Sequence, residues 1–414
     1  MVRVTENTDK KPAKIILREL QDEIAREVWE AKERGEKIGW CASNFPQEIT
    51  TAMGIPVVYP ENMGAAVGAK GGGQRMCEYA EGLGYSSDLC SYSRINLAYA
   101  QLKECPEIEI PMPDFLLCCN NICNCLMKWF ENLSYELDIP MILIDIPHLD
   151  AYECDADRVR YIRAQFDDCI VRLEEITGKK MDFDKLREVM DISQRSSRAW
   201  LRAVGQMRNT PSPFSGFDIF NNMAVACIGR GTEKAARAFE QLADEYAELA
   251  KEGKSTFKGN EKYRILFEGI ACWANLSYTY KALQSRGVNL TATVYGPAFS
   301  FLYSNLDELM AAYAYVPNCN DFERELELRV GEAIDKKVDG AIIHINRSCK
   351  KWSGNMYEME RQLKERAGIP VVTFDGDQSD PRAFSEAQYD TRIQALVEIM
   401  EANKLKNGGA NADA

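Results

Sequence analysis

A cysteine-rich stretch at residues 113–131 constrains the fold of this chain more than any other part of the sequence. It opens with proline and a short apolar run, breaks at Asn120-Asn121, and resumes with residues that favour a helix. This order predicts a strand, a loop and a helix. The stretch contains four cysteines, Cys118, Cys119, Cys123 and Cys125. Because a helix N-terminus favours a thiolate and lowers the pKa of a thiol, we expect the stretch to bind a soft metal or a metal cluster.

Apolar runs typical of buried strands alternate with helical patterns along the chain. The expected strands cover the start of the cysteine-rich stretch and residues 38–41, 56–59, 140–145, 264–269, 289–295, 340–345 and 370–374. Between the two groups of strands, from residue 155, apolar residues recur at helical spacing. The sequence therefore predicts an α/β fold with two lobes. Their mostly parallel sheets are flanked by helices and joined by a helical layer, and we expect the cluster in the crevice between the lobes.

The patterning divides the chain into five segments. We predict an N-terminal helix at residues 1–35, an N-terminal α/β domain at 36–150, a helical connecting region at 151–260, a C-terminal α/β domain at 261–403 and a flexible tail at 404–414. A chain of 414 residues is too long for one ordinary core. Each α/β domain is therefore expected to bury its own apolar interior.

Composition excludes several classes of partner. Acidic residues outnumber basic ones by 63 to 50, which gives a net charge of −13 and argues against nucleic acid. Residues 1–12 are polar and carry charges of both signs without the apolar core of a secretory signal, and no apolar run approaches the length of a membrane span. We expect no membrane association and a cytoplasmic location, so that the 14 cysteines are free thiols or ligands. With only two histidines, His148 and His344, metal chemistry shifts towards sulfur.

Cysteines that follow strands are the best candidates for a site, because open α/β sheets bind ligands outside the carboxyl ends of their strands. Cys349 follows the expected strand at residues 340–345, and Cys90 lies in a polar loop that could reach the same crevice. Together with one cysteine of the central stretch they would form a site between the lobes. Because the sequence has no CxxC pair, spacing alone leaves an iron–sulfur site and a structural zinc site both open.

Five segments together resemble a known family. They are residues 40–48 (WCASNFPQE), 59–62 (YPEN), 88–92 (DLCSY), 119–124 (CNNICN) and 344–350 (HINRSCK). The combination is similar to 2-hydroxyacyl-CoA dehydratases, within the superfamily of benzoyl-CoA reductases and 2-hydroxyglutaryl-CoA dehydratases. It resembles the α-type subunit most, and the resemblance covers most of the chain.

The resemblance implies an enzyme subunit that removes water from an (R)-2-hydroxyacyl-CoA through a ketyl radical to give a 2-enoyl-CoA. It implies a heterodimer with a homologous β subunit and a separate ATP-dependent iron–sulfur activator protein that supplies one electron. It also implies an oxygen-sensitive [4Fe–4S] cluster with three cysteine ligands and one open iron, in an anaerobic bacterium. A flavin is compatible with the resemblance and is not predicted.

The resemblance also implies which residues form the site. Carried over by position, the ligands of the iron are Cys90, Cys123 and Cys349. Cys119, at the end of the expected strand, is the alternative to Cys123, because extra cysteines crowd this segment. Cys123 is favoured as the ligand because it lies at the junction of the loop and the expected helix, towards which the amide donors of the helix point.

Ser43 and Glu61 are the candidate catalytic residues for proton transfer. Both follow expected strands at the same edge of the sheet, and similar positions in the family lie near the substrate. The alternative for Ser43 is a helix N-cap. The alternative for Glu61 is a solvated carboxylate in a loop.

Two alternative functions remain open from the sequence. One is a benzoyl-CoA reductase-like subunit, which would reduce a ring instead of removing water. The other is a noncatalytic iron–sulfur electron-transfer protein. The acyl group is also open among lactoyl, 2-hydroxyisocaproyl and phenyllactoyl thioesters.

Overall fold

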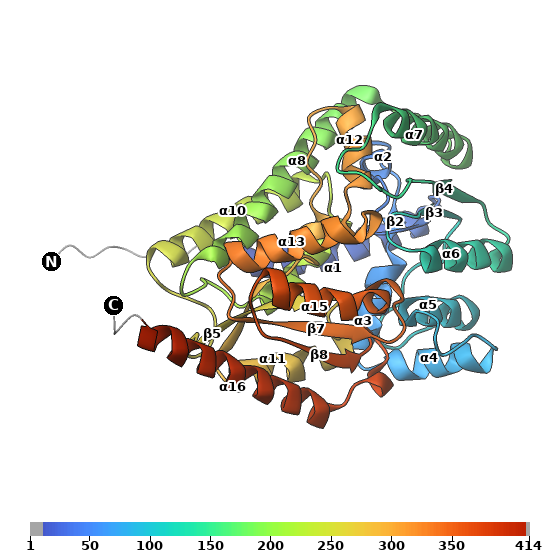
Figure 1. Ribbon diagram of the computed structural model, residues 1–414. Coiled ribbons are helices and arrows are strands. Elements are labelled where there is room, and N and C mark those ends of the chain that lie inside the picture. The colour runs from blue at the N-terminus through green and yellow to red at the C-terminus, as the bar shows by residue number, and fades with distance from the viewer. Residues whose placement is uncertain (1–10, 411–414) are drawn as a thin grey trace.

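The computed structural model describes residues 11–410, which form two four-stranded parallel sheets flanked by helices (Figure 1). The first sheet contains β1 (Gly39–Cys41), β2 (Val57–Val58), β3 (Phe115–Cys119) and β4 (Met141–Ile144). The second contains β5 (Tyr263–Glu268), β6 (Val288–Ala292), β7 (Gly340–Asn346) and β8 (Val371–Gly376). The predicted α/β class and its two sheets are confirmed.

The two sheets share one topology. Their strand orders are β2-β1-β3-β4 and β6-β5-β7-β8, and every pairing in both is parallel. In each sheet the second strand lies on one side of the first and the third strand on the other. The chain therefore reverses direction across the sheet between β1 and β3, and again between β5 and β7. Such switch points leave a crevice at the carboxyl ends of the two central strands.

Burial explains why these short segments form strands. Every residue of β3, β5 and β6 is buried. A parallel sheet is buried in this way because helices cover both of its faces; β3 is apolar throughout, whereas β5 and β6 also bury polar side chains such as Glu268 and Asn289. One apolar core surrounds the first sheet, and two further cores cover the opposite faces of the second. The cores are shared between the halves of the chain: Phe301 and Leu309 pack in the core of the first sheet, and Leu17 of the N-terminal helix packs in a core of the second.

Six helices belong to the first half of the chain. They are α1 (Ala13–Glu33), α2 (Gln47–Ala52), α3 (Pro60–Ala69), α4 (Gly73–Gly82), α5 (Ser91–Leu102) and α6 (Asn124–Leu137). α6 packs against β3 and β4, and α5 packs against α6. Because α3 begins at Pro60, Glu61 lies in the first turn of a helix and not in a loop.

Four helices connect the two sheets: α7 (Ala156–Thr177), α8 (Phe183–Gly205), α9 (Phe217–Ile228) and α10 (Glu233–Lys251). The side chains of Asp155, Asp182 and Thr232 accept hydrogen bonds from the first amides of α7, α8 and α10, which explains where these helices begin. α8 and α10 pack along each other at one side of the molecule (Figure 1). Their contact includes the rings of Trp200 and Phe239, with centroids 5.2 Å apart.

The second half contains α11 (Leu276–Gln284), α12 (Leu306–Ala314), α13 (Phe322–Asp335), α14 (Lys351–Gly354), α15 (Met356–Arg366) and α16 (Glu386–Ala410). α13 and α15 pack on the second sheet, and α16 packs on β8 and α11 (Figure 1). α12 returns to the first half and packs against α7. Among residues 11–410, no helix is long and apolar enough to cross a membrane.

α16 continues to Ala410, so helix extends into most of the segment expected to be a flexible tail. The sequence carries no helical signal there because the glycine and asparagine residues after Lys404 are poor helix formers. Residues 1–10 of the expected N-terminal helix and residues 411–414 of the expected tail lie outside the described residues. The five segment boundaries themselves stay a prediction.

A buried ion pair joins α13 to the end of β5. Arg329 Nη2 lies 2.7 Å from Glu268 Oε1, and both side chains are inaccessible to solvent. Replacing Arg329 with leucine leaves the carboxylate buried without a partner, so we expect Arg329→Leu to lower the free energy of unfolding by about 3–5 kcal/mol, measured by urea denaturation. The double variant with Glu268→Leu should recover most of this loss. Arg361→Leu, which removes an exposed pair with Glu358, is the control and should cost below about 1 kcal/mol; equal losses would contradict the prediction.

Candidate functional site

A cavity lies between the two sheets, at the carboxyl ends of their central strands. Its walls include one residue from the loop after each central strand: Asn44 after β1, Ile122 after β3, Ile270 after β5 and Cys349 after β7. The cavity has a volume of about 100 Å³ and is mostly apolar. Both switch points of the fold therefore open onto one space, which is where an α/β protein is expected to bind its ligand.

Four free cysteines line this cavity, and they come from three separate loops. They are Cys90, Cys123, Cys125 and Cys349. The same four thiols also line a larger hollow of about 740 Å³ on the outer side of the cavity. The fold thus brings together the three cysteines that the family resemblance implies as ligands, and it adds Cys125 to them.

Local structure places two of these thiols at helix starts. Cys90 is the N-cap of α5, and Cys123 is the N-cap of α6. Cys349 lies just before the short helix α14, where the amides of Lys351 and Trp352 are close to its thiol. The amides of Lys351 and Trp352 therefore face the Cys349 thiol, and the amide of Leu126 faces the Cys123 thiol, where they can bind an anionic sulfur.

Burial outweighs those amides in the protein itself. It raises the pKa of Cys123, and it raises the pKa of Cys349 to about 11. The expectation of a lowered thiol pKa at the helix start of the cysteine-rich stretch is therefore wrong for Cys123. A buried thiolate loses its hydration, and amides alone do not compensate for that loss. A cation in the cavity would reverse the balance, since a thiol that coordinates a metal is deprotonated.

Cys125 was not among the residues predicted for the site. A hydrogen bond between the two thiols raises the pKa of Cys90, the donor, and lowers that of Cys125, the acceptor, to about 7. Its spacing offered a signal. Two residues beyond Cys123, in the first turn of the same helix, a side chain can still reach the loop end of that helix.

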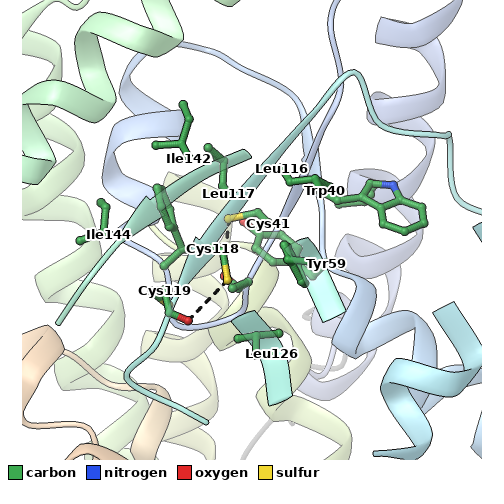
Figure 2. Packing of buried hydrophobic residues seen from close by; sticks show 14 of the residues in the cluster. Trp40, Cys41, Tyr59, Leu116, Leu117, Cys118, Cys119, Leu126, Ile142 and Ile144 are labelled. Atoms are coloured by element: carbon green, nitrogen blue, oxygen red, sulfur yellow. Dashed lines mark hydrogen bonds between the residues drawn. The ribbon is translucent and has the colours of Figure 1, made fainter. Parts of the chain in front are cut away.

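The other cysteines of the central stretch are part of the core. Cys118 and Cys119 belong to β3, are inaccessible to solvent and pack with apolar side chains of β1 and β4 (Figure 2). Cys41 is equally buried beside them (Figure 2). Cys119, the alternative to Cys123, does not line the cavity.

Two asparagines hold the loop that carries Cys123. Asn121 is buried, and its Nδ2 donates hydrogen bonds to the backbone oxygens of Asn44 at 3.3 Å and Tyr313 at 2.9 Å. Asn120 Oδ1 accepts a hydrogen bond from the amide of Ile146 at 2.7 Å. These contacts fix the turn against the loop after β1 and against α12, so the position of Cys123 depends on both.

Ser43 and Glu61 are brought together next to the cysteines. The Ser43 amide donates a hydrogen bond of 2.7 Å to Glu61 Oε2, and Glu61 lines the cavity. Burial raises the pKa of Glu61, while the Ser43 contact opposes that rise. The alternatives for both residues are wrong: the N-cap of α2 is Pro46, not Ser43, and Glu61 is in a helix and largely enclosed.

The donor set distinguishes between kinds of metal site. Within residues 11–410, no three His, Cys, Asp or Glu side chains are arranged to hold a single metal ion. In a [4Fe–4S] cluster each thiolate binds a different iron, so its cysteines stand further apart than the ligands of one ion. Thiols from three loops around one apolar cavity therefore fit a cluster better than a closed tetrahedral zinc site.

Comparison with known families gives one match over most of the chain. Residues 42–400 match the model of the family described as 2-hydroxyglutaryl-CoA dehydratase, D-component. The match starts directly after β1 and includes every residue that lines the cavity. It therefore spans the entire site.

Characterised relatives cover nearly the full chain. The (R)-phenyllactyl-CoA dehydratase alpha subunit of Clostridium sporogenes is 59% identical over 394 residues, which is 95% of this chain and 97% of that protein. The (R)-2-hydroxyisocaproyl-CoA dehydratase alpha subunit of Clostridioides difficile is 45% identical over 97% of this chain and 99% of that protein. A benzoyl-CoA reductase subunit of Thauera aromatica is more distant, at 26% identity over 90% of this chain and 91% of that protein.

Glu61 gives the site a pH-dependent effect on stability. A carboxyl whose pKa is raised in the folded protein stabilises the fold while it is protonated, and that contribution is lost as pH rises through the folded-state pKa. Glutamine stays neutral, so the melting temperature of Glu61→Gln relative to the parent, measured by calorimetry from about pH 5 to pH 8, should increase with pH, because this scan begins above the ordinary pKa of glutamate.

The control for this measurement is Glu358→Gln. The Arg361 guanidinium lowers the pKa of the exposed Glu358 carboxyl to about 2, so it is ionised in folded and unfolded chains above pH ~6. Its melting-temperature difference should stay flat across the upper part of the range. A flat or falling difference for Glu61→Gln would show that its carboxyl is not destabilised by burial.

Proposed function

This chain belongs to the 2-hydroxyglutaryl-CoA dehydratase D-component family, and we propose that it is the α subunit of a 2-hydroxyacyl-CoA dehydratase, a hydro-lyase. The observation that carries the proposal is the convergence of Cys90, Cys123 and Cys349 with Glu61 on one cavity. The relatives named as dehydratase alpha subunits support it, as does the greater distance to benzoyl-CoA reductase. An electron-transfer protein would not need an apolar cavity of this kind beside its cluster.

We assign a [4Fe–4S] cluster to Cys90, Cys123 and Cys349, the thiols at the ends of three loops. When bound, the cluster supplies one-electron chemistry and a Lewis-acidic iron for an oxygen of the substrate. The full proposal is the loss of water from an (R)-2-hydroxyacyl-CoA through a ketyl radical of the substrate, after one-electron activation by a separate ATP-dependent protein. The partner is a homologous β subunit, and the oxygen sensitivity of such chemistry suits the cytoplasm of an anaerobe.

Glu61 is the group that we propose to take the proton from the substrate. It lines the cavity beside the cysteines, and its raised pKa makes the carboxylate a stronger base than an exposed glutamate. The Ser43 amide donates a hydrogen bond of 2.7 Å to Oε2, which orients the carboxylate on the cavity wall. Ser43 thus positions the base instead of reacting itself.

The cavity wall favours an apolar acyl group. Trp129, Phe299 and Trp352 line it together with aliphatic side chains. Lys351 is the only basic side chain on this wall within the described chain, and it already pairs with the buried Glu325 carboxylate. An acyl group that ends in a carboxylate would therefore be buried without a partner, which is costly. We infer that the substrate carries an aromatic or branched apolar side chain.

The cluster assignment predicts a specific loss of iron. Anaerobically purified protein should contain about four irons and as many acid-labile sulfides per chain, as expected for one [4Fe–4S] cluster. The combined replacement of Cys90, Cys123 and Cys349 by serine should remove them. Cys119→Ser is the control and should keep its iron, because Cys119 is in the core. Zinc in the parent, or loss of iron in the control with retention in Cys123→Ser, would contradict the assignment.

The substrate proposal predicts an order of specificity. With the β subunit and an activator, kcat/KM for a phenyllactyl or isocaproyl thioester should exceed that for 2-hydroxyglutaryl-CoA by about 10- to 100-fold, because burying an apolar side chain gains roughly 1.5–3 kcal/mol. Steady-state formation of the enoyl thioester measures it. Glu61→Gln should lose turnover with every thioester and keep its iron. A preference for the 2-hydroxyglutaryl thioester would contradict the apolar cavity as the acyl site.

A further inference from the structure

The loop after β8 reaches the thiol of Cys90 through one side chain. Gln378 lines the cavity, is fully buried, and its Nε2 donates a hydrogen bond of 3.1 Å to Cys90 Sγ. The Gln378 carbonyl accepts a hydrogen bond of 2.9 Å from the amide of Trp273, so the backbone at this position is held as well. Gln378 therefore brings a neutral donor from the second half of the chain to a thiol of the first half.

The residue before Gln378 ties two cysteine loops together. Asp377 Oδ1 accepts hydrogen bonds from the amides of Ser379 at 2.9 Å and Asp380 at 3.0 Å, which closes the loop into a tight turn. Its Oδ2 accepts a hydrogen bond from the hydroxyl of Ser348, the residue before Cys349. The Ser348 hydroxyl in turn accepts a hydrogen bond of 3.1 Å from the amide of Ser91, the residue after Cys90.

A buried ion pair fixes the far end of the same turn. Arg94, on the first turns of α5, pairs with Asp380 at 3.0 Å, and both side chains are buried. α5 begins directly after Cys90. The turn that carries Gln378 and the helix that carries Cys90 therefore move as one unit, so the contact between amide and sulfur is held by the fold and not by a free side chain.

The orientation of the Gln378 amide suits an anionic sulfur. Its Oε1 is buried and has no hydrogen-bond partner within the part of the chain that the structure describes. If the Gln378 amide were flipped, a neutral Cys90 thiol could donate a hydrogen bond to Oε1. A thiolate can only accept, so it requires the NH2 group on its side. Gln378 Nε2 lies 3.1 Å from Cys90 Sγ, so the NH2 group is on the side that a thiolate ligand needs.

We propose that Gln378 sets the reduction potential of the cluster by donating its side-chain N–H to the Cys90 thiolate. The inference rests on the cluster assignment of the proposed function. A donor to a ligand sulfur withdraws electron density from the iron and stabilises the reduced cluster, and such hydrogen bonds are among the factors that set iron–sulfur potentials. Gln378 is thus a tuning residue that acts through Cys90. The donor makes the cluster easier to reduce by the one electron that the activator delivers.

The test compares three variants of the anaerobically purified α–β complex. Gln378→Leu removes the donor, and Gln378→Glu replaces it with a group of the same shape that accepts instead. Gln194→Leu is the matched control, because Gln194 is also buried but donates to the Phe301 carbonyl at 2.6 Å. Iron and sulfide analysis of each protein comes first. A parent without iron–sulfur would overturn the proposed function, and this inference with it.

The decisive measurement is a reductive titration of the cluster followed by electron paramagnetic resonance. The midpoint potential should fall in Gln378→Leu, fall further in Gln378→Glu, and match the parent in Gln194→Leu. Resonance Raman spectra of the oxidised proteins give a second readout, in which the Fe–S(Cys) bands shift only in the two Gln378 variants. Iron-loaded Gln378 variants with the potential and the bands of the parent would overturn the inference while leaving the dehydratase assignment intact. If Gln378→Leu loses iron, the isosteric Gln378→Glu decides.

Discussion

The site depends on one geometric constraint: the switch points of two parallel sheets open onto the same cavity. In each sheet the chain crosses from one side to the other between its two central strands, so the loops after β1 and β3, and after β5 and β7, diverge and leave space. The two halves contribute Ile122 and Ile270 to the same wall. A ligand in this space touches both halves at once, and any change in how they pack changes the distance between Cys123 and Cys349.

Burial makes that space unsuitable for free thiolates and suitable for a cluster. Desolvation raises the pKa of Cys123 and Cys349 even though backbone amides point at both sulfurs. Backbone amides are the dipoles directed at these sulfurs, and Lys351, the basic side chain on the cavity wall, is already paired with Glu325. In the proposed cluster, iron would supply the positive charge that stabilises these thiolates. In the proposed reaction, the apolar wall that raises the pKa of these thiols would also exclude water from the substrate.

Sequence patterns were sufficient for the strands and insufficient for the contacts between loops. β3 and β7 were predictable because continuous apolar runs bounded by turn residues leave few alternatives to a buried strand. α3 was missed because Pro60 reads as a loop residue, although proline is favoured at the first position of a helix. Gln378 carries no local signal at all. Its role arises from a hydrogen bond to a residue 288 positions away, which only the packing of the two halves creates.

A buried network of charged and polar side chains around Glu48 supports the turn that carries Cys123. Asn121 donates to the Tyr313 carbonyl, and the Tyr313 hydroxyl lies 2.7 Å from Glu48 Oε2 and 2.9 Å from Arg230 Nη1. Ser193 also donates to Glu48, at 2.9 Å, so α2, α8 and α12 meet at one carboxylate.

A buried network of this kind contributes little net stability compared with apolar packing, but its directional bonds admit few alternative arrangements. We infer that the network serves mainly to fix the position of α12 relative to the first sheet. Through the hydrogen bond of Asn121 it also fixes the turn that carries Cys123. Apolar side chains in place of this polar network could keep the helices packed, yet they would not fix the position of the Tyr313 carbonyl. The position of a cluster ligand would then depend on packing alone.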